Sequence, residues 1–338
     1  MNSDAESPAN SSEVRNARAE AQAKLGPGFF ARVLEPSPPA ITTEPFFADD
    51  PVDRAGAGDN TLVLPTGLDG GTDWSAITAD DPDLARWAAT NWLGGERRLP
   101  QPPADLTATR LALHRLGVYV IAPARHAANG KFGLRYTLGG FGTPFFADTA
   151  GADNQIRVAG TNLVHQQAEQ VRVSPITTLQ AAADFLGTTI DTETAAEHDS
   201  PEAGDPDEAL TVTEEASRFL GDWFGMAFAA LEVVRADDAS VDPSRPQLWP
   251  GHFDPAIEVG DEDHRGSYGA SPGDHSIDEP YLYLSIWYPD RIGVESADPA
   301  WNAPSFTGAI LKLSDFPADV DPVTVAADFW KTARDRLG

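Results

Sequence analysis

The sequence of 338 residues contains no cysteine, and only four of its 24 basic residues are lysines. Without cysteine, the chain has no disulfides, no thiolate metal sites and no cysteine nucleophile. It has no run of 18 apolar residues, so we predict no transmembrane helix. Its first 24 residues are polar and contain no apolar stretch, so we predict no secretory signal. We therefore expect a cytoplasmic protein.

Two common functional signatures are also missing. The chain has no His-Glu-x-x-His motif, which would place two zinc ligands and a base on one helix face. It has no Gly-Lys-Ser/Thr sequence, which a phosphate-binding P-loop requires. Function therefore has to be inferred from less specific patterns.

Charge is strongly one-sided. Asp and Glu number 52 against 24 Lys and Arg, which gives a net charge of -28. Such a surface repels nucleic acid and anionic membranes, and we predict neither as a partner. Residues 97–137 are the exception, because they hold seven basic residues against the single acid Asp105.

These basic residues have two interpretations. They pair with acids across the fold, or Arg125 and Arg135 help to bind an anion. The glycine-rich segment Gly139-Gly140-Phe141-Gly142 follows them, and glycine can turn backbone N–H groups toward an anion. A tight turn between two strands would use the same residues.

The chain divides by composition into five parts. A Pro- and Gly-rich irregular arm contains one short predicted helix, and a stretch of eight acids without Lys or Arg separates two more regular segments. The predicted parts are a disordered N-terminus at 1–24, the arm at 25–104 with its helix at 81–93, a first half at 105–187, an acidic linker at 188–210 and a second half at 211–338.

Each half has the predicted order helix, strands, helix. Short connections favour antiparallel strands, and strands grouped between helices favour an α+β fold with two related halves. In the first half we predict a helix at 107–122 ended by Pro123, strands at 132–138, 155–159 and 162–166, and a helix at 178–186 between a Thr177 or Thr178 cap and Gly187. In the second half we predict a helix at 213–235 with a Thr211/Glu214 capping box, strands at 252–259, 264–269, 280–288 and 306–313, and a helix from Asp321-Pro322 onward.

Two of these strands have chemically distinct faces. Side chains alternate along a strand, so Tyr281, Tyr283 and Trp287 share one face of strand 280–288. The same parity places His252 and Asp254 on one face of strand 252–259. If the two strands pair with matching faces, all five side chains share one surface.

This surface is the candidate site. We predict His252 and Asp254 as polar anchors with catalytic potential, because an Asp can orient a His for general-base work. A divalent metal held by His252, Asp254 and a third ligand, His264 or else His275, is a second interpretation. An ordinary strand with one wet face is a third. The predicted ligand-binding residues are Trp249, Tyr281, Tyr283, Trp287, Trp301, Arg125 and Arg135.

Several short blocks resemble an uncharacterised, mainly actinobacterial protein family, and more distantly a broader bacterial family of unknown function. The resemblance covers about residues 80–338 and implies a soluble bacterial protein, but no activity. The blocks are Leu113-His114-Arg115-Leu116, Ala122-Pro123-Ala124-Arg125, Gly133-Leu134-Arg135, Gly139–Pro144, Gln247–Asp254, Tyr268–Asp274, Glu279–Tyr283 and Trp301–Pro304.

Three functions stay open at this point. The chain is a small-molecule-binding protein or enzyme with a His/Asp/Tyr/Trp-lined site, a metal-dependent hydrolase with His and carboxylate ligands, or a non-catalytic interaction module. The interaction module predicts a large exposed apolar patch.

Overall fold

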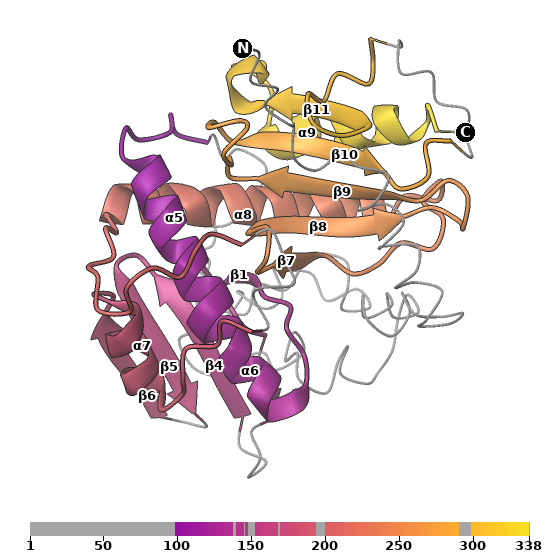
Figure 1. Ribbon diagram of the computed structural model, residues 1–338. Coiled ribbons are helices and arrows are strands. Elements are labelled where there is room, and N and C mark those ends of the chain that lie inside the picture. The colour runs from indigo at the N-terminus through magenta and orange to yellow at the C-terminus, as the bar shows by residue number, and fades with distance from the viewer. Residues whose placement is uncertain are drawn as a thin grey trace, which may run out of the picture.

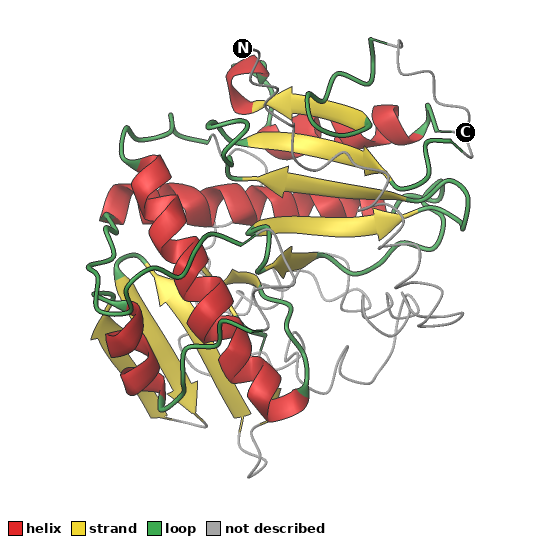
Figure 2. Ribbon diagram, in the orientation of Figure 1, coloured by secondary structure: helices red, strands yellow, loops and turns green. Residues whose placement is uncertain are grey.

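The computed structural model describes residues 99–137, 140–144, 146–147, 153–167, 170–193, 200–290 and 299–337. The predicted disordered N-terminus, most of the irregular arm and the helix at 81–93 lie outside these ranges. In the described part, helices accompany two antiparallel sheets, which confirms the α+β class (Figures 1 and 2).

The first sheet has the strand order β1-β2-β4-β5-β6, with β3 also paired to β4. Its helices precede and follow it in sequence. The strands are β1 (Arg135–Thr137), β2 (Gly140–Gly142), β3 (Phe146–Ala147), β4 (Asp153–Ala159), β5 (Asn162–Gln167) and β6 (Gln170–Pro175), and the helices are α5 (Leu106–Leu116), α6 (Ala122–Asn129) and α7 (Leu179–Leu186).

The second sheet has the strand order β11-β10-β9-β8-β7, and each strand pairs with its sequence neighbour. It is therefore a meander. The strands are β7 (Gln247–Trp249), β8 (Asp254–Val259), β9 (Gly266–Ser271), β10 (Tyr281–Ile286) and β11 (Gly308–Lys312), flanked by α8 (Glu214–Arg235) and α9 (Pro322–Arg334).

Helix α8 connects the two sheets. Its apolar stripe packs on β1 and β2 of the first sheet and on β8 and β9 of the second, and Figure 1 shows it running behind the second sheet. An antiparallel bridge between Leu134 and Leu248 joins the facing edges of the sheets. The buried hydrophobic residues of both sheets consequently form one cluster.

Several helix ends agree with the sequence patterns. The Thr178 hydroxyl accepts a hydrogen bond from the Ala181 N–H and caps α7, and Gly187 ends that helix in the left-handed conformation. Asp321 caps α9 with Pro322 behind it. At α8 the cap is Thr213 rather than the predicted Thr211, and its hydroxyl accepts from the Ala216 N–H.

The predicted stop at Pro123 is wrong. The helical path continues from α5 through a π-helical segment, Gly117–Ile121, into α6, with Pro123 in the first turn of α6. Proline removes the hydrogen bond to the carbonyl four residues earlier, which is that of Tyr119. The Asp191 N–H donates to this carbonyl at 3.0 Å instead. The acceptor that proline leaves unused is thus satisfied by another segment.

The glycine-rich segment is a strand and not an anion-binding turn in its described part. Gly140 and Gly142 belong to β2, between β1 and β4. A Cβ atom at either glycine would lie 2.3 Å from a carbonyl oxygen of β4, that of Val158 or Ile156. Glycine is needed here for close approach of two strands.

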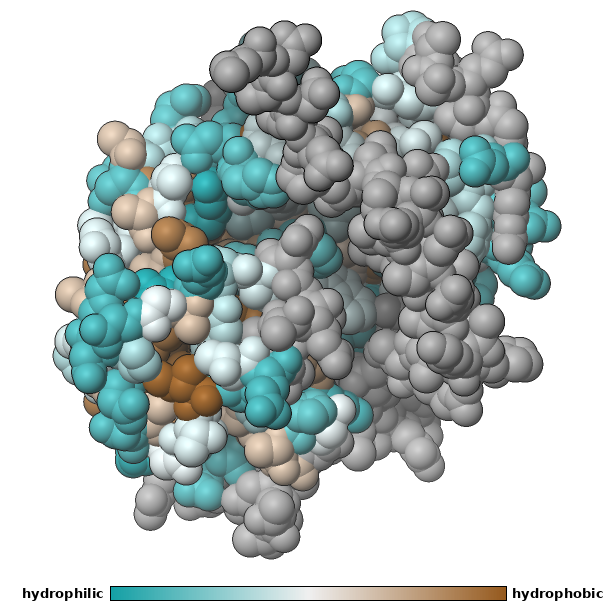
Figure 3. Space-filling view, viewed as in Figure 1, coloured by the Kyte–Doolittle hydropathy of each residue, from teal (hydrophilic) through white to brown (hydrophobic). Residues whose placement is uncertain are grey.

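Apolar exposure is dispersed. On the side shown in Figure 3, the described residues present a mainly hydrophilic surface with small separate hydrophobic patches. The large hydrophobic residues that are exposed in the described part are Leu111 on α5, Val171 and Val173 on β6, Val233 on α8, and Val241 and Val320 in loops. None of the described helices is both long enough and apolar enough to span a lipid bilayer.

Candidate functional site

The basic residues of 97–137 are largely used inside the fold. Arg115 donates to the carboxylate of Glu208 and to the carbonyl of Ala203. Arg125 is buried and donates to the carbonyl of Gly133, eight residues along the chain. Burial lowers the pKa of Arg135 to about 10, against the opposing effect of the Glu232 carboxylate. Arg125 is therefore held inside the fold, and the binding of a ligand by Arg125 and Arg135 stays a prediction.

His252 and Asp254 do not lie on the same strand, so the alternation of side chains along a strand does not put them on one face. β8 begins at Asp254, and Phe253 has a φ of 58°, a conformation that bulky residues rarely adopt. His252 consequently lies in the turn before the strand and is exposed, whereas Asp254 is buried. Burial raises the pKa of the Asp254 carboxyl, and His252 is near enough to offset part of that rise.

The predicted pairing of strands 252–259 and 280–288 is also wrong, because β9 lies between them. The predicted meeting of their polar faces nevertheless occurs across β9. The Tyr283 hydroxyl on β10 donates to Asp254 Oδ2 on β8 at 2.5 Å.

Gly269 on β9 makes this contact possible. It pairs with Tyr283 on one side and with Ala256 on the other. A Cβ atom on Gly269 would lie 2.4 Å from both Cζ and the hydroxyl oxygen of Tyr283. The phenol ring therefore crosses the sheet over a position without a side chain, and a larger residue there would displace it.

Asp254 is incompletely paired. Only 4% of the residue is exposed, and its second oxygen, Oδ1, is buried without a hydrogen-bond partner in the described part of the chain. Burial raises the pKa of this carboxyl, although nearby His252, the Tyr283 hydrogen bond and the backbone N–H of Asp254 itself oppose the shift. A buried polar atom without a partner is costly, so its retention points to a role other than stability.

A second tyrosine–carboxylate pair lies beside the first. The Tyr281 hydroxyl donates to Asp274 Oδ2 at 2.6 Å, and the ring centroids of Tyr281 and Tyr283 are 6.3 Å apart. Asp274 Oδ1 also accepts from the backbone N–H groups of Ser276 and Ile277. Asp274 is thus a well-held carboxylate, unlike Asp254.

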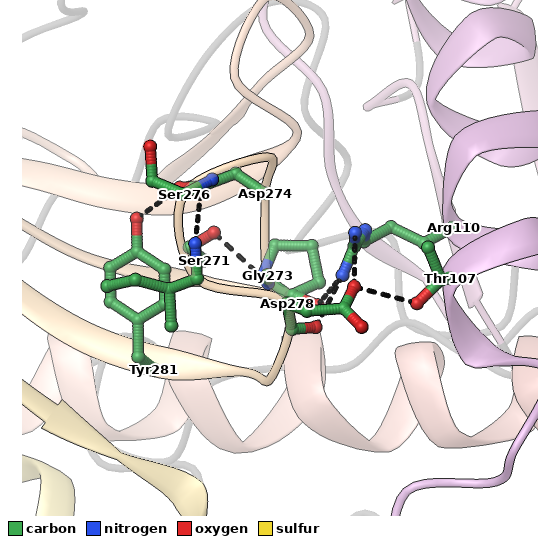
Figure 4. A network of polar contacts seen from close by, with 10 residues as sticks. Thr107, Arg110, Ser271, Gly273, Asp274, Ser276, Asp278 and Tyr281 are labelled. Atoms are coloured by element: carbon green, nitrogen blue, oxygen red, sulfur yellow. Dashed lines mark hydrogen bonds and ion pairs between the residues drawn. The ribbon is translucent and has the colours of Figure 1, made fainter.

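The loop carrying Asp274 is held by helix α5, which precedes the first sheet. Figure 4 shows Tyr281 and Asp274 on one side of the loop and Arg110 of α5 on the other. Arg110 donates to the carbonyl of Pro272 at 3.2 Å, to that of Asp278 at 2.8 Å and to the Asp278 carboxylate at 3.2 Å. Segment 271–274, whose Ser-Pro-Gly-Asp sequence is typical of a plain turn, is therefore an anchored loop.

One turn further along α5, His114 holds the neighbouring turn. Its Nε2 lies 2.9 Å from the carbonyl oxygen of Pro250 and 3.2 Å from that of Gly251. Its ring stacks on Phe253 with centroids 5.1 Å apart, and burial lowers its pKa to about 4. A neutral imidazole that donates from Nε2 fits these contacts, so His114 has a structural role, as its place inside a helix would suggest.

The other predicted residues divide between the site and its surroundings. Trp249 is half-buried and pairs directly with Asp254 across β7 and β8, so their side chains share a face. Trp287 donates to the Ser267 hydroxyl, which in turn donates to the buried Glu258. Trp301 is half-buried and packs against the hydrophobic core.

The predicted metal ligands are not brought together. His264 lies in the turn after β8 and contacts Asp261 at 3.0 Å, whereas Asp254 begins that strand. Five residue steps of β-strand separate the two ends by roughly 16 Å. Among the described residues, no group of three or more His, Asp or Glu side chains is arranged to hold a metal ion.

Sequence reasoning missed Gly269, Asp274 and the two residues of α5. The sequence does contain a motif that includes Gly269. Gly269-Ala270-Ser271-Pro272-Gly273 has the Gly-x-Ser-x-Gly spacing of a nucleophile elbow. Such an elbow leads from a strand into a helix, whereas Ser271 ends β9 and leads into a loop and β10. The Ser271 hydroxyl accepts from the Gly273 N–H, so the motif serves the loop.

Comparison with known proteins gives no independent assignment. No family model, no curated protein and no solved structure matches the chain. Any functional assignment therefore rests on the geometry around Asp254.

Proposed function

We propose that this protein binds a small molecule at a site centred on Asp254 and Tyr283. The supporting residues come from four adjacent strands of the second sheet: Trp249 on β7, Asp254 on β8, Gly269 on β9, and Tyr281 and Tyr283 on β10. Such a mixture of aromatic rings with a few polar groups is typical of ligand sites.

The main support is the buried Asp254 Oδ1 without a partner among the described residues. Its neighbours argue against a simple packing defect. Tyr283 satisfies the other oxygen, Gly269 leaves space for that phenol, and Arg110 and His114 hold the two adjoining loops. An elaborate support around one unpaired atom favours a ligand that pairs with it.

The other hypotheses have less support. The metal-dependent hydrolase has less support, since His264 lies at the far end of β8 and the described residues contain no group of three His, Asp or Glu side chains arranged to hold a metal, with His275 or without it. The interaction module has less support, since the large hydrophobic residues exposed in the described part are few and are spread over several segments. A catalytic role for Asp254 and His252 stays a prediction, because the geometry supports binding and indicates no particular reaction.

Three further proposals concern the whole chain. A cytoplasmic location and membership of the resembling family stay proposals. A duplication is supported by element order, since α5 and α7 flank the first group of strands as α8 and α9 flank the second. A superposition of 105–187 on 211–338 tests it, and unrelated strand directions would contradict it.

A small-molecule screen tests the proposed function. The melting temperature of the full chain is measured against several hundred polar metabolites, and stabilising compounds are retested on Asp254→Asn. Binding to the native state raises the melting temperature. We expect at least one compound that stabilises the wild type and not Asp254→Asn. Compounds that stabilise both equally would contradict the site.

Asp207→Asn is the matched control. It changes the same chemical group at an exposed position in segment 200–210, where the Pro206 carbonyl accepts from the Gln180 N–H of α7. It should respond to every compound as the wild type does.

A further inference from the structure

We propose that the ligand of this site is a small organic cation with N–H donors, such as an amine or a guanidine, that donates to Asp254 Oδ1. This inference rests on the proposed function and specifies the class of ligand. It goes beyond that function because the presence of a site does not fix the charge of what binds there.

The unpaired oxygen of Asp254 favours a donor with positive charge. A carboxyl oxygen accepts hydrogen bonds, and a charged N–H donor makes the stronger bond to it. The Tyr283 hydroxyl already donates to Oδ2. Asp254 is only 4% exposed, so the partner of Oδ1 has to enter the site rather than remain in bulk water.

The charge around Asp254 favours the same class of ligand. Two more carboxylates act on this network: Asp274 raises the pKa of the Asp254 carboxyl, and Glu258 raises that of the Tyr283 hydroxyl. Of the main groups that affect the Asp254 pKa, one is basic, the imidazole of His252. An anionic ligand would face three carboxylates, whereas a cation would be attracted by them.

The aromatic rings beside Asp254 provide a second means of attracting a cation. The rings of Tyr281 and Tyr283 are inclined at 53° with centroids 6.3 Å apart, and Trp249 flanks Asp254 on β7. Aromatic faces attract cations, most strongly where water is excluded. A carboxylate beside aromatic rings recognises a protonated nitrogen through both its charge and its N–H groups.

Calorimetric titration of the full chain with a matched panel tests the inference. The cations are methylammonium, putrescine, agmatine and guanidinium; choline tests a cation without N–H; acetate and phosphate are the anions; acetamide and urea are neutral. We expect saturable binding of at least one N–H cation. Its affinity should fall about 10- to 100-fold in Asp254→Asn and stay unchanged in Asp207→Asn.

The outcomes distinguish the ligand class from the site itself. If acetate, phosphate or a neutral compound binds in an Asp254-dependent way and no cation does, the ligand class is wrong and the site stands. If no compound of the panel or the wider screen depends on Asp254, both proposals fail. Choline binding as tightly as the N–H cations would contradict donation to Oδ1.

If Asp254→Asn does not fold, the position of the bound cation can be measured in the wild-type protein instead. The backbone amide signal of Gly269 in wild-type protein should shift with the bound cation, because Tyr283 lies directly over this residue. A bound cation that leaves Gly269 and its β8 neighbours unshifted would overturn the assignment.

Discussion

Arg110 on α5 and Asp278 in the β9–β10 loop join the helix that precedes the first sheet to the second sheet. Arg110 is buried, and it donates to both the backbone carbonyl and the carboxylate of Asp278. The loop between these contacts carries Asp274, which holds Tyr281. The position of this loop therefore depends on contacts with helix α5.

Replacement of Arg110 and of Asp278 should have unequal effects. Arg110→Ala leaves the carbonyls of Pro272 and Asp278 without their donor and should lower the free energy of unfolding by about 2–4 kcal/mol. Asp278→Asn removes a charge that is 77% exposed and should cost less than about 1 kcal/mol. Denaturant unfolding of both variants checks this, and equal losses would show that the ion pair matters more than the backbone contacts.

Gly269→Ala should disturb the site more than a neighbouring glycine replacement does. The new Cβ would lie 2.4 Å from the Tyr283 ring, and such overpacking typically costs about 1–3 kcal/mol. Gly266→Ala on the same strand is the control. Its Cβ would lie 3.1 Å from the nearest atom, the Ser285 carbonyl oxygen. Denaturant unfolding and ligand binding should both be more impaired in Gly269→Ala. Similar values for the two variants would mean that Tyr283 can move away at little cost.

Asp254 should make stability fall as the pH rises. Burial raises its pKa in the folded protein above the unfolded value of about 3.9, so the folded state binds more protons between these two pKa values. Its contribution to stability is thus greatest in acid and declines as the pH rises through the raised pKa. In Asp254→Asn, the free energy of unfolding should decline less over this window. A difference between variant and wild type that does not change with pH would contradict the raised pKa.

His114 should act in the opposite direction. Its pKa is about 4 in the folded protein against 6.5 when unperturbed, so the unfolded state binds the proton first as the pH falls. Acidification from about pH 6.5 to 4 should therefore cost up to about 3 kcal/mol through this group. His114→Gln can still donate to the Pro250 carbonyl but does not titrate. Its stability relative to the wild type should rise across this window, and a constant difference would show that His114 is readily protonated in the fold.

Local sequence patterns were sufficient for α8, for the start of α9 and for the faces of β10. The period of the apolar residues in 213–235 matches α8, and Asp321-Pro322 marks the start of α9. Alternation along 280–288 placed Tyr281 and Tyr283 on the face that meets Asp254. These patterns are local, since a few consecutive residues determine which side chains share a face.

Other features of the fold and of the site depended on contacts between residues that are distant in the sequence. Pro123 continues a helix because Asp191, 68 positions away, takes the Tyr119 carbonyl. Strand parity failed at His252 because Phe253 adopts a positive φ while packing against His114, Phe141 and Phe224. The unpaired Asp254 oxygen results from the whole local arrangement, so no spacing of residues in the chain indicates it.

The most direct test of the site is a titration of ¹⁵N-labelled wild-type protein and Asp254→Asn with the cation that binds best, followed at the Gly269 amide. If Asp254 Oδ1 anchors the ligand beneath the Tyr283 ring, this amide shifts saturably in the wild type and stays unchanged in the variant at the same concentrations. An equal shift in both proteins, or a bound ligand that perturbs neither β8 nor β9, would contradict a binding site at Asp254.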